Sequence, residues 1–214
     1  HLVQFFLFEQ QTLPLKEITG LFGPNGHGKS SVIDAIQVAM FGANDHLQAF
    51  NAQADEQARS RSLRAYCLGQ YGEGPDQRVR ENATTYITLI WRDTETGAPL
   101  SMGVCIYAAG DRDKHEVLGR YILPGVELSM RDHLDVVDGE EQPRAWATFR
   151  HNLNERSRVS GQDPLFSSSE RYITAALLAL RGSGGAPVPG NHAGAGWRVE
   201  ANLPATNFVP QLDL

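Results

Sequence analysis

The chain has 214 residues, a mass of 23.5 kDa and a formal charge of −6, with 41% apolar and 21% charged residues. This length predicts one or two domains that can bury a core without disulfide staples. The acidic balance argues against a generally basic nucleic-acid coat, although it allows a local basic patch. We expect neither a membrane span nor a secretory signal, because the chain shows no apolar run of 18 residues and no basic-then-apolar leader.

The first 42 residues predict a strand, a loop and a helix. Residues 2–8 form an apolar and aromatic run typical of a strand, and residues 18–22 are interpreted as a short buried strand. From Lys29 to Phe41, apolar residues recur at three- and four-residue spacing, which predicts a helix that stops at Gly42.

The middle of the chain carries the clearest β pattern. Residues 84–92 and 100–108 are predicted to form a hairpin within the range 84–108, and residues 120–123 a third strand. Residues 143–153 are expected to be helical. The spacing of Ser167 and Glu170 predicts a capping box ahead of a last helix.

The C-terminal part changes in composition. Residues 182–200 are rich in glycine, alanine and proline and are predicted to be a linker or disordered. Residues 201–214 form a short apolar terminal segment without a clear period. The predicted lobe therefore covers residues 2–181.

The loop at residues 23–30 matches G-x-x-x-x-G-K-[ST] in full. Its glycines let backbone N–H groups approach phosphate oxygens, and the following helix adds its positive dipole end. Lys29 is the predicted catalytic residue because its cation can reach the β- and γ-phosphates, and the Ser30 hydroxyl suits Mg²⁺. The predicted ATP contacts are Gly23, Pro24, Asn25, Gly26, His27, Gly28, Lys29, Ser30 and Ser31. The alternative interpretation is a glycine-rich turn that serves only for packing, but it would not explain the lysine at position 29.

The loop and the residues that follow it, 32–36, resemble the SMC and SbcC branch of the ABC ATPases. Residues 2–8, residues 61–69 and the hairpin at 84–108 resemble the N-terminal head lobe of MukB-like condensins of the MksB or JetC type, the ATPases of Wadjet plasmid-defence systems. The resemblance covers about residues 2–181. It implies an α/β P-loop lobe with a mixed sheet and an antiparallel β subdomain over residues 84–123.

The resemblance also implies a mechanism and partners. Two heads would sandwich two ATP molecules with Mg²⁺, and hydrolysis would drive DNA translocation or loop extrusion. The implied partners are the C-terminal lobe of the same head, a second head, kleisin and KITE subunits, a nuclease and DNA. The implied location is the bacterial cytoplasm, at the nucleoid.

Two motifs of a complete ATPase site are missing from the sequence. Residues 134–140 are the nearest string to a second acidic motif, but Asp135 interrupts the apolar run, so we interpret them as a surface turn. Residues 183–185 match only the middle of a signature motif. We therefore expect the site to be completed in trans.

Two further ligands are left open. Gln211 follows an apolar-Pro string that resembles the family's Q-loop, so it is a candidate Mg²⁺ ligand, or else part of a terminal segment foreign to this lobe. Arg64 belongs to an arginine-rich stretch at 59–80 and could contact nucleotide or DNA phosphate, or lie in a solvated loop. We expect Asp34 to make a structural hydrogen bond and Cys67 and Cys105 to be inert core residues.

Three rival functions are compatible with the sequence. The first is a DNA-repair head of the SbcC or RecF type. The second is a self-contained P-loop kinase or NTPase, which would need an internal carboxylate such as Asp135 or Asp138 for Mg²⁺. The third is a scaffold that binds ATP without hydrolysing it.

Overall fold

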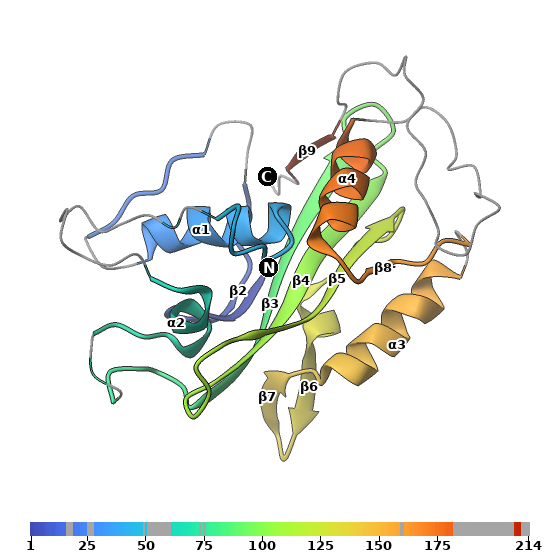
Figure 1. Cartoon of the computed structure of the whole chain (residues 1–214). Coiled ribbons are helices and arrows are strands. Elements are labelled where there is room, and N and C mark those ends of the chain that lie inside the picture. Colours follow the sequence, from blue (N-terminus) through green and yellow to red (C-terminus); the bar gives the residue numbers. More distant parts are fainter. Residues whose placement is uncertain are drawn as a thin grey trace.

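The fold is built on one antiparallel sheet (Figure 1). The structure, a computed structural model, describes residues 1–15, 19–24, 28–48, 50, 61–72, 74, 76–158 and 161–181, and the backbone of 208–210. The sheet has seven strands in the order β2-β1-β3-β4-β5-β8, with β9 beside β3. They are β1 (Leu2–Phe5), β2 (Phe8–Gln11), β3 (Asn82–Asp93), β4 (Pro99–Ala109), β5 (Glu116–Pro124), β8 (Leu165–Phe166) and β9 (Phe208–Pro210).

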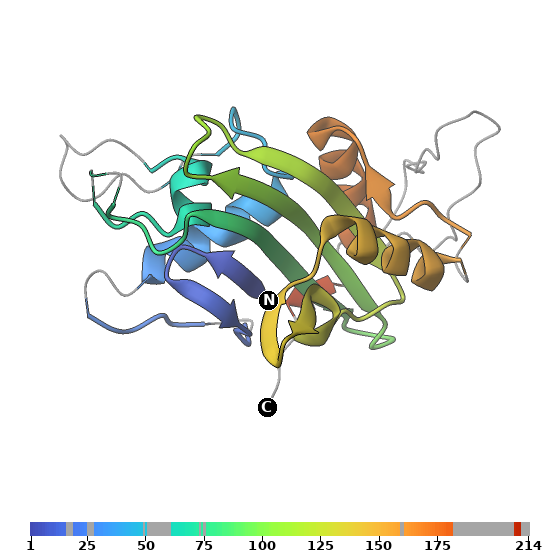
Figure 2. The same ribbon diagram turned by 90° about the horizontal axis from the view of Figure 1, so that it is seen from below.

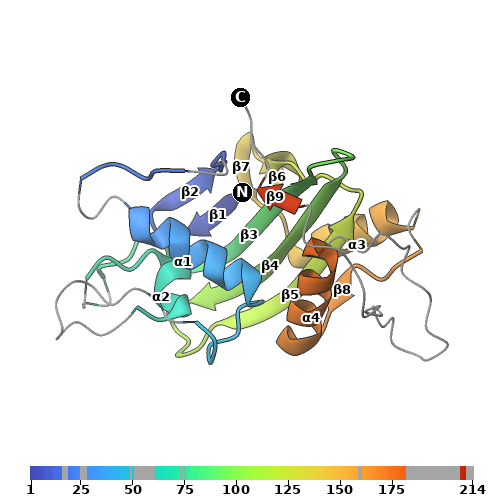
Figure 3. The same ribbon diagram turned by 90° about the horizontal axis from the view of Figure 1, so that it is seen from above.

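In the described part of the chain, four α-helices cover the two faces of this sheet. Helices α1 (Lys29–Met40), α2 (Leu63–Leu68) and α4 (Ser169–Leu180) lie on one face, as the view from above shows (Figure 3). Helix α3 (Trp146–Ser157) lies on the other face beside a separate hairpin of β6 (Leu134–Val137) and β7 (Glu140–Pro143), preceded by a 3₁₀ turn at Met130–His133 (Figure 2). None of the described helices is long and apolar enough to cross a membrane.

The predicted hairpin forms the centre of the sheet. Strands β3 and β4 pair from Asn82 with Ala109 to Arg92 with Pro99, so each extends one or two residues past the predicted bounds. Because side chains alternate between the faces of a strand, Ile87 joins the core under α1, whereas Tyr86 joins the core under α3. The strand predicted at residues 120–123 is present as part of β5.

Helix α1 ends in a fully bonded C-terminal turn. Gly42 adopts φ +61°, the N–H of Ala43 donates to the carbonyl of Val38, and the N–H of Gly42 donates to that of Ala39. This Schellman pattern needs a residue that tolerates positive φ, which explains the stop at Gly42. The Nε of Arg120 donates to the Gly42 carbonyl at 2.5 Å and so ties the turn to β5.

Three expectations from the sequence are wrong. The sheet is not mixed, because every pairing between described strands is antiparallel; the antiparallel arrangement predicted for residues 84–123 is present in β3, β4 and β5, which share their sheet with β1. Residues 19–24, the described part of the predicted strand and loop, contain no strand. Phe22 there is 95% exposed, which a buried strand does not allow. The cap of α4 is Ser168, one residue later than predicted; its hydroxyl accepts from the N–H of Arg171.

The C-terminal segments lie mostly outside the described residues. This holds for the predicted linker at residues 182–200 and for most of residues 201–214. The exception is the backbone of β9, where Phe208, Val209 and Pro210 pair with Asp93, Arg92 and Trp91.

Candidate nucleotide-binding site

The N-terminal end of α1 has the geometry of an anion site. Gly28 caps the helix with φ +86° and ψ 8°, a conformation that glycine adopts without a side-chain penalty. A Cβ built at Gly28 would lie 3.0 Å from the Phe8 ring, so the backbone passes close to the sheet. The first N–H groups of a helix have no intrahelical acceptor, and the first turn here contains no acidic side chain. These donors are therefore available to phosphate oxygens.

Lys29 folds back over the loop. Its Nζ donates to the carbonyls of Gly23 at 2.7 Å and Pro24 at 2.8 Å, and the group is exposed. Gly23 has φ +152°, a backbone conformation that side-chain-bearing residues rarely adopt. An ammonium group has three donors, so this lysine can also bind a phosphate oxygen from the same position.

The two serines after Lys29 differ in exposure. Ser30 is exposed and lines a groove beside α1, where its hydroxyl can meet a metal-bound phosphate. Ser31 is buried, so its predicted contact with nucleotide rests on its backbone N–H. The other predicted ligands Asn25, Gly26, His27 and Gln211 lie outside the described residues and stay predictions.

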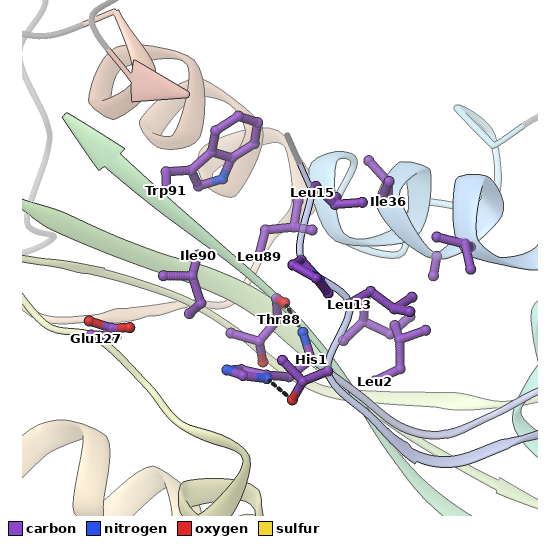
Figure 4. Close-up of a pocket in the computed structure, with 15 residues that line it drawn as sticks. His1, Leu2, Leu13, Leu15, Ile36, Thr88, Leu89, Ile90, Trp91 and Glu127 are labelled. Carbon is purple, nitrogen blue, oxygen red and sulfur yellow. Dashed lines mark hydrogen bonds between the residues drawn. The ribbon is translucent and has the colours of Figure 1, made fainter. Parts of the chain in front are cut away.

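The flank of α1 next to the loop is hollow and largely apolar. A groove of about 440 Å³ runs beside Lys29 and Ser30. It is lined by Leu15, Thr19, Leu21, Lys29, Ser30, Val32, Ile33 and Ile36. A second hollow of about 200 Å³ lies between α1 and the edge of β3, with Leu13 and Leu15 beside it, Ile36 on the helix, and Leu89, Ile90 and Trp91 on the strand (Figure 4). Ile33 is half exposed, so the helix presents apolar surface to water here.

A buried hydrogen bond fastens α1 to α2. The Tyr66 hydroxyl donates to Oδ2 of Asp34 at 2.5 Å, which confirms the structural role expected for this carboxylate. Burial raises the pKa of Tyr66, and the bond to Asp34 raises it further. The hydroxyl therefore stays protonated and acts as a donor. The sequence pattern did not indicate Tyr66, because no local spacing relates it to a residue 32 positions earlier.

Arg61 and Arg64 make different contacts. The Arg61 guanidinium lies 4.5 Å from the centroid of the Phe6 ring, and the same ring comes within 3.9 Å of a Cβ built at Gly28. The guanidinium of Arg64 instead donates to the carbonyls of Ala109 at 3.2 Å and Gly110 at 3.0 Å, at the end of β4. These bonds give Arg64 a structural role. The contact partners, which are remote in sequence, distinguish the two arginines.

The string nearest to a second acidic motif lies far from the loop. Residues 134–140 form β6 and the turn to β7, on the face of the sheet opposite α1 (Figures 1 and 2). Asp135 is paired with Arg144 at 2.8 Å, and Val136 is 70% exposed. The surface interpretation is therefore confirmed, and neither Asp135 nor Asp138 can reach a metal ion at Ser30.

Both cysteines are sealed in the core. Cys67 and Cys105 are fully buried, and burial raises the pKa of both thiols, that of Cys67 to about 12. Thiols of this kind remain protonated and unreactive. The described residues contain no group of three or more histidine, cysteine or acidic side chains that could hold a metal ion.

Comparison with known proteins bears on the first quarter of the chain. Residues 1–57 match the family described as the P-loop containing region of AAA domain. The match supports a P-loop NTPase and with it the binding of a nucleotide, usually with Mg²⁺. No curated protein and no solved structure matches the chain.

Proposed function

We propose that this chain is the ATP-binding half of an SMC-like head ATPase. The observation that carries the proposal is the end of α1, where Gly28, Lys29 and Ser30 present backbone donors, a cation and a hydroxyl beside an open groove. Phosphoryl transfer is catalysed mainly by positioning and electrostatics, and these groups supply the phosphate-binding part. The P-loop family match over residues 1–57 supports nucleotide binding itself.

The site needs a carboxylate that the described residues do not bring to it. A C-terminal lobe from a second segment or chain would supply the acidic motif for Mg²⁺ and water, and a second head would supply the signature motif. The apolar flank at Leu21, Phe22 and Ile33 offers a surface for such a lobe, since exposed apolar patches mark interaction sites.

In this proposal the cell-level role follows the resemblance to MukB-like condensins. ATP binding would close two heads, and hydrolysis would separate them to drive DNA translocation or loop extrusion in the bacterial cytoplasm. Kleisin and KITE subunits and a nuclease would be the partners in anti-plasmid defence. A DNA-repair head of the SbcC or RecF type is the sibling candidate, and the identity of the co-purifying subunits distinguishes them.

The test is reconstitution with the C-terminal lobe. We expect the chain alone to bind ATP and Mg²⁺ with little turnover, and turnover to rise at least tenfold when the lobe is added. Lys29→Ala should abolish that rise, because it removes the cation that meets the β- and γ-phosphates. Arg150→Ala, at an exposed position of α3, is the matched control and should leave the rise intact. Turnover that survives Lys29→Ala contradicts the proposal.

A self-contained NTPase and a non-hydrolysing scaffold would give different results in the same assay. Steady turnover by the isolated chain would favour the self-contained NTPase, although the opposite-face position of Asp135 argues against it. Tight ATP binding with no turnover in the presence of the lobe would favour the scaffold.

A further inference from the structure

The P-loop helix is fastened to its neighbours by tyrosine hydroxyls at two points. Tyr66 of α2 donates to Oδ2 of Asp34 at 2.5 Å, and Tyr172 of α4 donates to the carbonyl of Ala39 at 2.7 Å. All four residues are almost completely buried. The first bond lies one turn after Ser30, and the second lies in the last turn of the helix.

The bond at Asp34 holds the end of the helix that faces the loop. Donors stabilise a buried carboxylate, and the Tyr66 hydroxyl is one of the partners of Asp34. Tyr66 is itself held rigidly: its ring stacks on Phe5 with centroids 5.0 Å apart and planes at 8°. The N–H of Phe6 donates to the Tyr66 carbonyl at 2.7 Å, which ties α2 to the turn after β1. The hydroxyl therefore has a fixed position relative to the sheet.

We propose that Tyr66 and Asp34 are positioning residues for nucleotide binding, which set the place of the helix N-terminus against the loop. The inference rests on the nucleotide-binding function proposed above. An α-helix moves nearly as a rigid rod over one turn, so a bond at Asp34 fixes the N–H groups of Lys29, Ser30 and Ser31. Displacement of about 1 Å in such groups is enough to weaken binding of a phosphate.

The same contact also connects the helix to Arg61. Phe6 lies edge-on to Tyr66 with centroids 5.9 Å apart, and the Arg61 guanidinium lies over Phe6. Arg61 lowers the pKa of the Tyr66 hydroxyl, against the larger effect of burial and of Asp34, so its charge is felt at this bond. The Tyr66 hydroxyl therefore lies between Asp34 of α1 and the charge of Arg61.

The test compares the same chemical change at two residues, one on α2 and one on α4, that both hydrogen-bond to α1. Tyr66→Phe and Tyr172→Phe each remove one buried hydroxyl and keep the ring. Tyr172→Phe should lower the Tm of the full chain by about 2–4 °C, as loss of one buried hydrogen bond does, and Tyr66→Phe by about twice as much because its acceptor is a carboxylate. Only Tyr66→Phe should weaken ATP binding, because Tyr172 acts at the far end of α1. The expected rise in Kd, measured by calorimetry with Mg²⁺, is about tenfold.

A second pair of variants separates positioning from folding. Asp34→Asn keeps an acceptor for the Tyr66 hydroxyl and should bind ATP within about threefold of the parent chain, whereas Asp34→Ala should match Tyr66→Phe. Equal loss of affinity in Tyr66→Phe and Tyr172→Phe would overturn the inference, and so would unchanged affinity in Tyr66→Phe.

Amide hydrogen exchange gives a readout that needs no nucleotide. Tyr66→Phe should speed exchange in the first half of α1 and Tyr172→Phe in the second half. If the parent chain binds no ATP, the proposed function fails. The exchange pattern still decides whether Tyr66 holds the loop end of the helix, and uniform exchange along α1 in Tyr66→Phe would refute it.

Discussion

The two faces of the sheet differ in how completely their side chains are buried. Under α3, Tyr86, Tyr121, His133 and Phe149 form a sealed aromatic cluster, with ring centroids of Phe149 at 4.8 Å from Tyr86 and 5.1 Å from His133. On the other face, α1 is well packed beneath but leaves its outer flank in water next to the loop. The sealed aromatic cluster and the candidate site therefore lie on opposite faces of the sheet, so substitutions in the cluster and on the open flank should have separable effects.

The largest effect is expected from the sealed face. Phe149→Ala should lower the free energy of unfolding by about 3–5 kcal/mol, because it removes a buried ring and leaves a cavity. Urea unfolding followed by tryptophan fluorescence measures this. Val136→Ala on the same face is 70% exposed and should change stability by less than about 0.5 kcal/mol. A loss below about 1 kcal/mol for Phe149→Ala would break the contrast between the faces.

The packing of the sealed face should also become less stable at acid pH. Burial lowers the pKa of His133 to about 4 from its usual 6.5, and Nδ1 donates to the Ser129 carbonyl at 2.8 Å while Nε2 accepts from Thr88 at 2.7 Å. On acidification, the unfolded chain binds a proton at this imidazole before the folded chain does. The contribution of neutral His133 to the free energy of unfolding is therefore fully present above pH 6.5 and is lost as the pH falls to 4.

The expected loss at His133 is about 3 kcal/mol, from a gap of about 2.5 pKa units. Unfolding by urea between pH 7 and pH 4 measures it. His133→Gln removes the titrating group, so its stability should fall less steeply over this range than that of the parent chain. Parallel curves would show that His133 does not drive the pH dependence.

A glycine pair sharpens the contrast at the loop. Gly28 and Gly139 have φ values of +86° and +85°, but only at Gly28 would a Cβ meet a neighbour, the Phe8 ring at 3.0 Å. Gly139→Ala should cost about 1 kcal/mol from backbone strain, and Gly28→Ala about 1–2 kcal/mol. Only Gly28→Ala should weaken ATP binding, as measured by calorimetry. Equal effects of both variants on ATP would contradict the site.

The smallest effect on stability is expected at the open flank. Phe22 is 95% exposed, so Phe22→Ser should change the free energy of unfolding by less than about 0.5 kcal/mol. It should nevertheless reduce stimulation of turnover by the C-terminal lobe, which the reconstitution assay measures. Val136→Ser on the sealed face is the matched exposed control. Full stimulation of Phe22→Ser would show that the flank is not the docking surface.

Local patterns predicted the elements whose signals are contained within a dozen residues. The alternation in β3 and β4, the helical spacing after Lys29 and the stop at Gly42 all correspond to elements of the structure. The P-loop motif was found in the same way, because its chemistry needs glycines and a lysine at fixed spacing. The strand predicted just before the loop failed, since an apolar run becomes a strand only when neighbouring strands bond its backbone.

The sequence by itself determined that this protein carries a phosphate-binding loop at the start of a helix. Only the tertiary structure decided what holds that helix, because Tyr66, Arg61 and Tyr172 reach it through contacts with residues far away in the chain. It likewise decided that β1 joins the hairpin across more than 80 residues, and that Asp135 lies on the wrong face for a metal ion. Such contacts depend on long-range packing, which no local spacing of residues encodes.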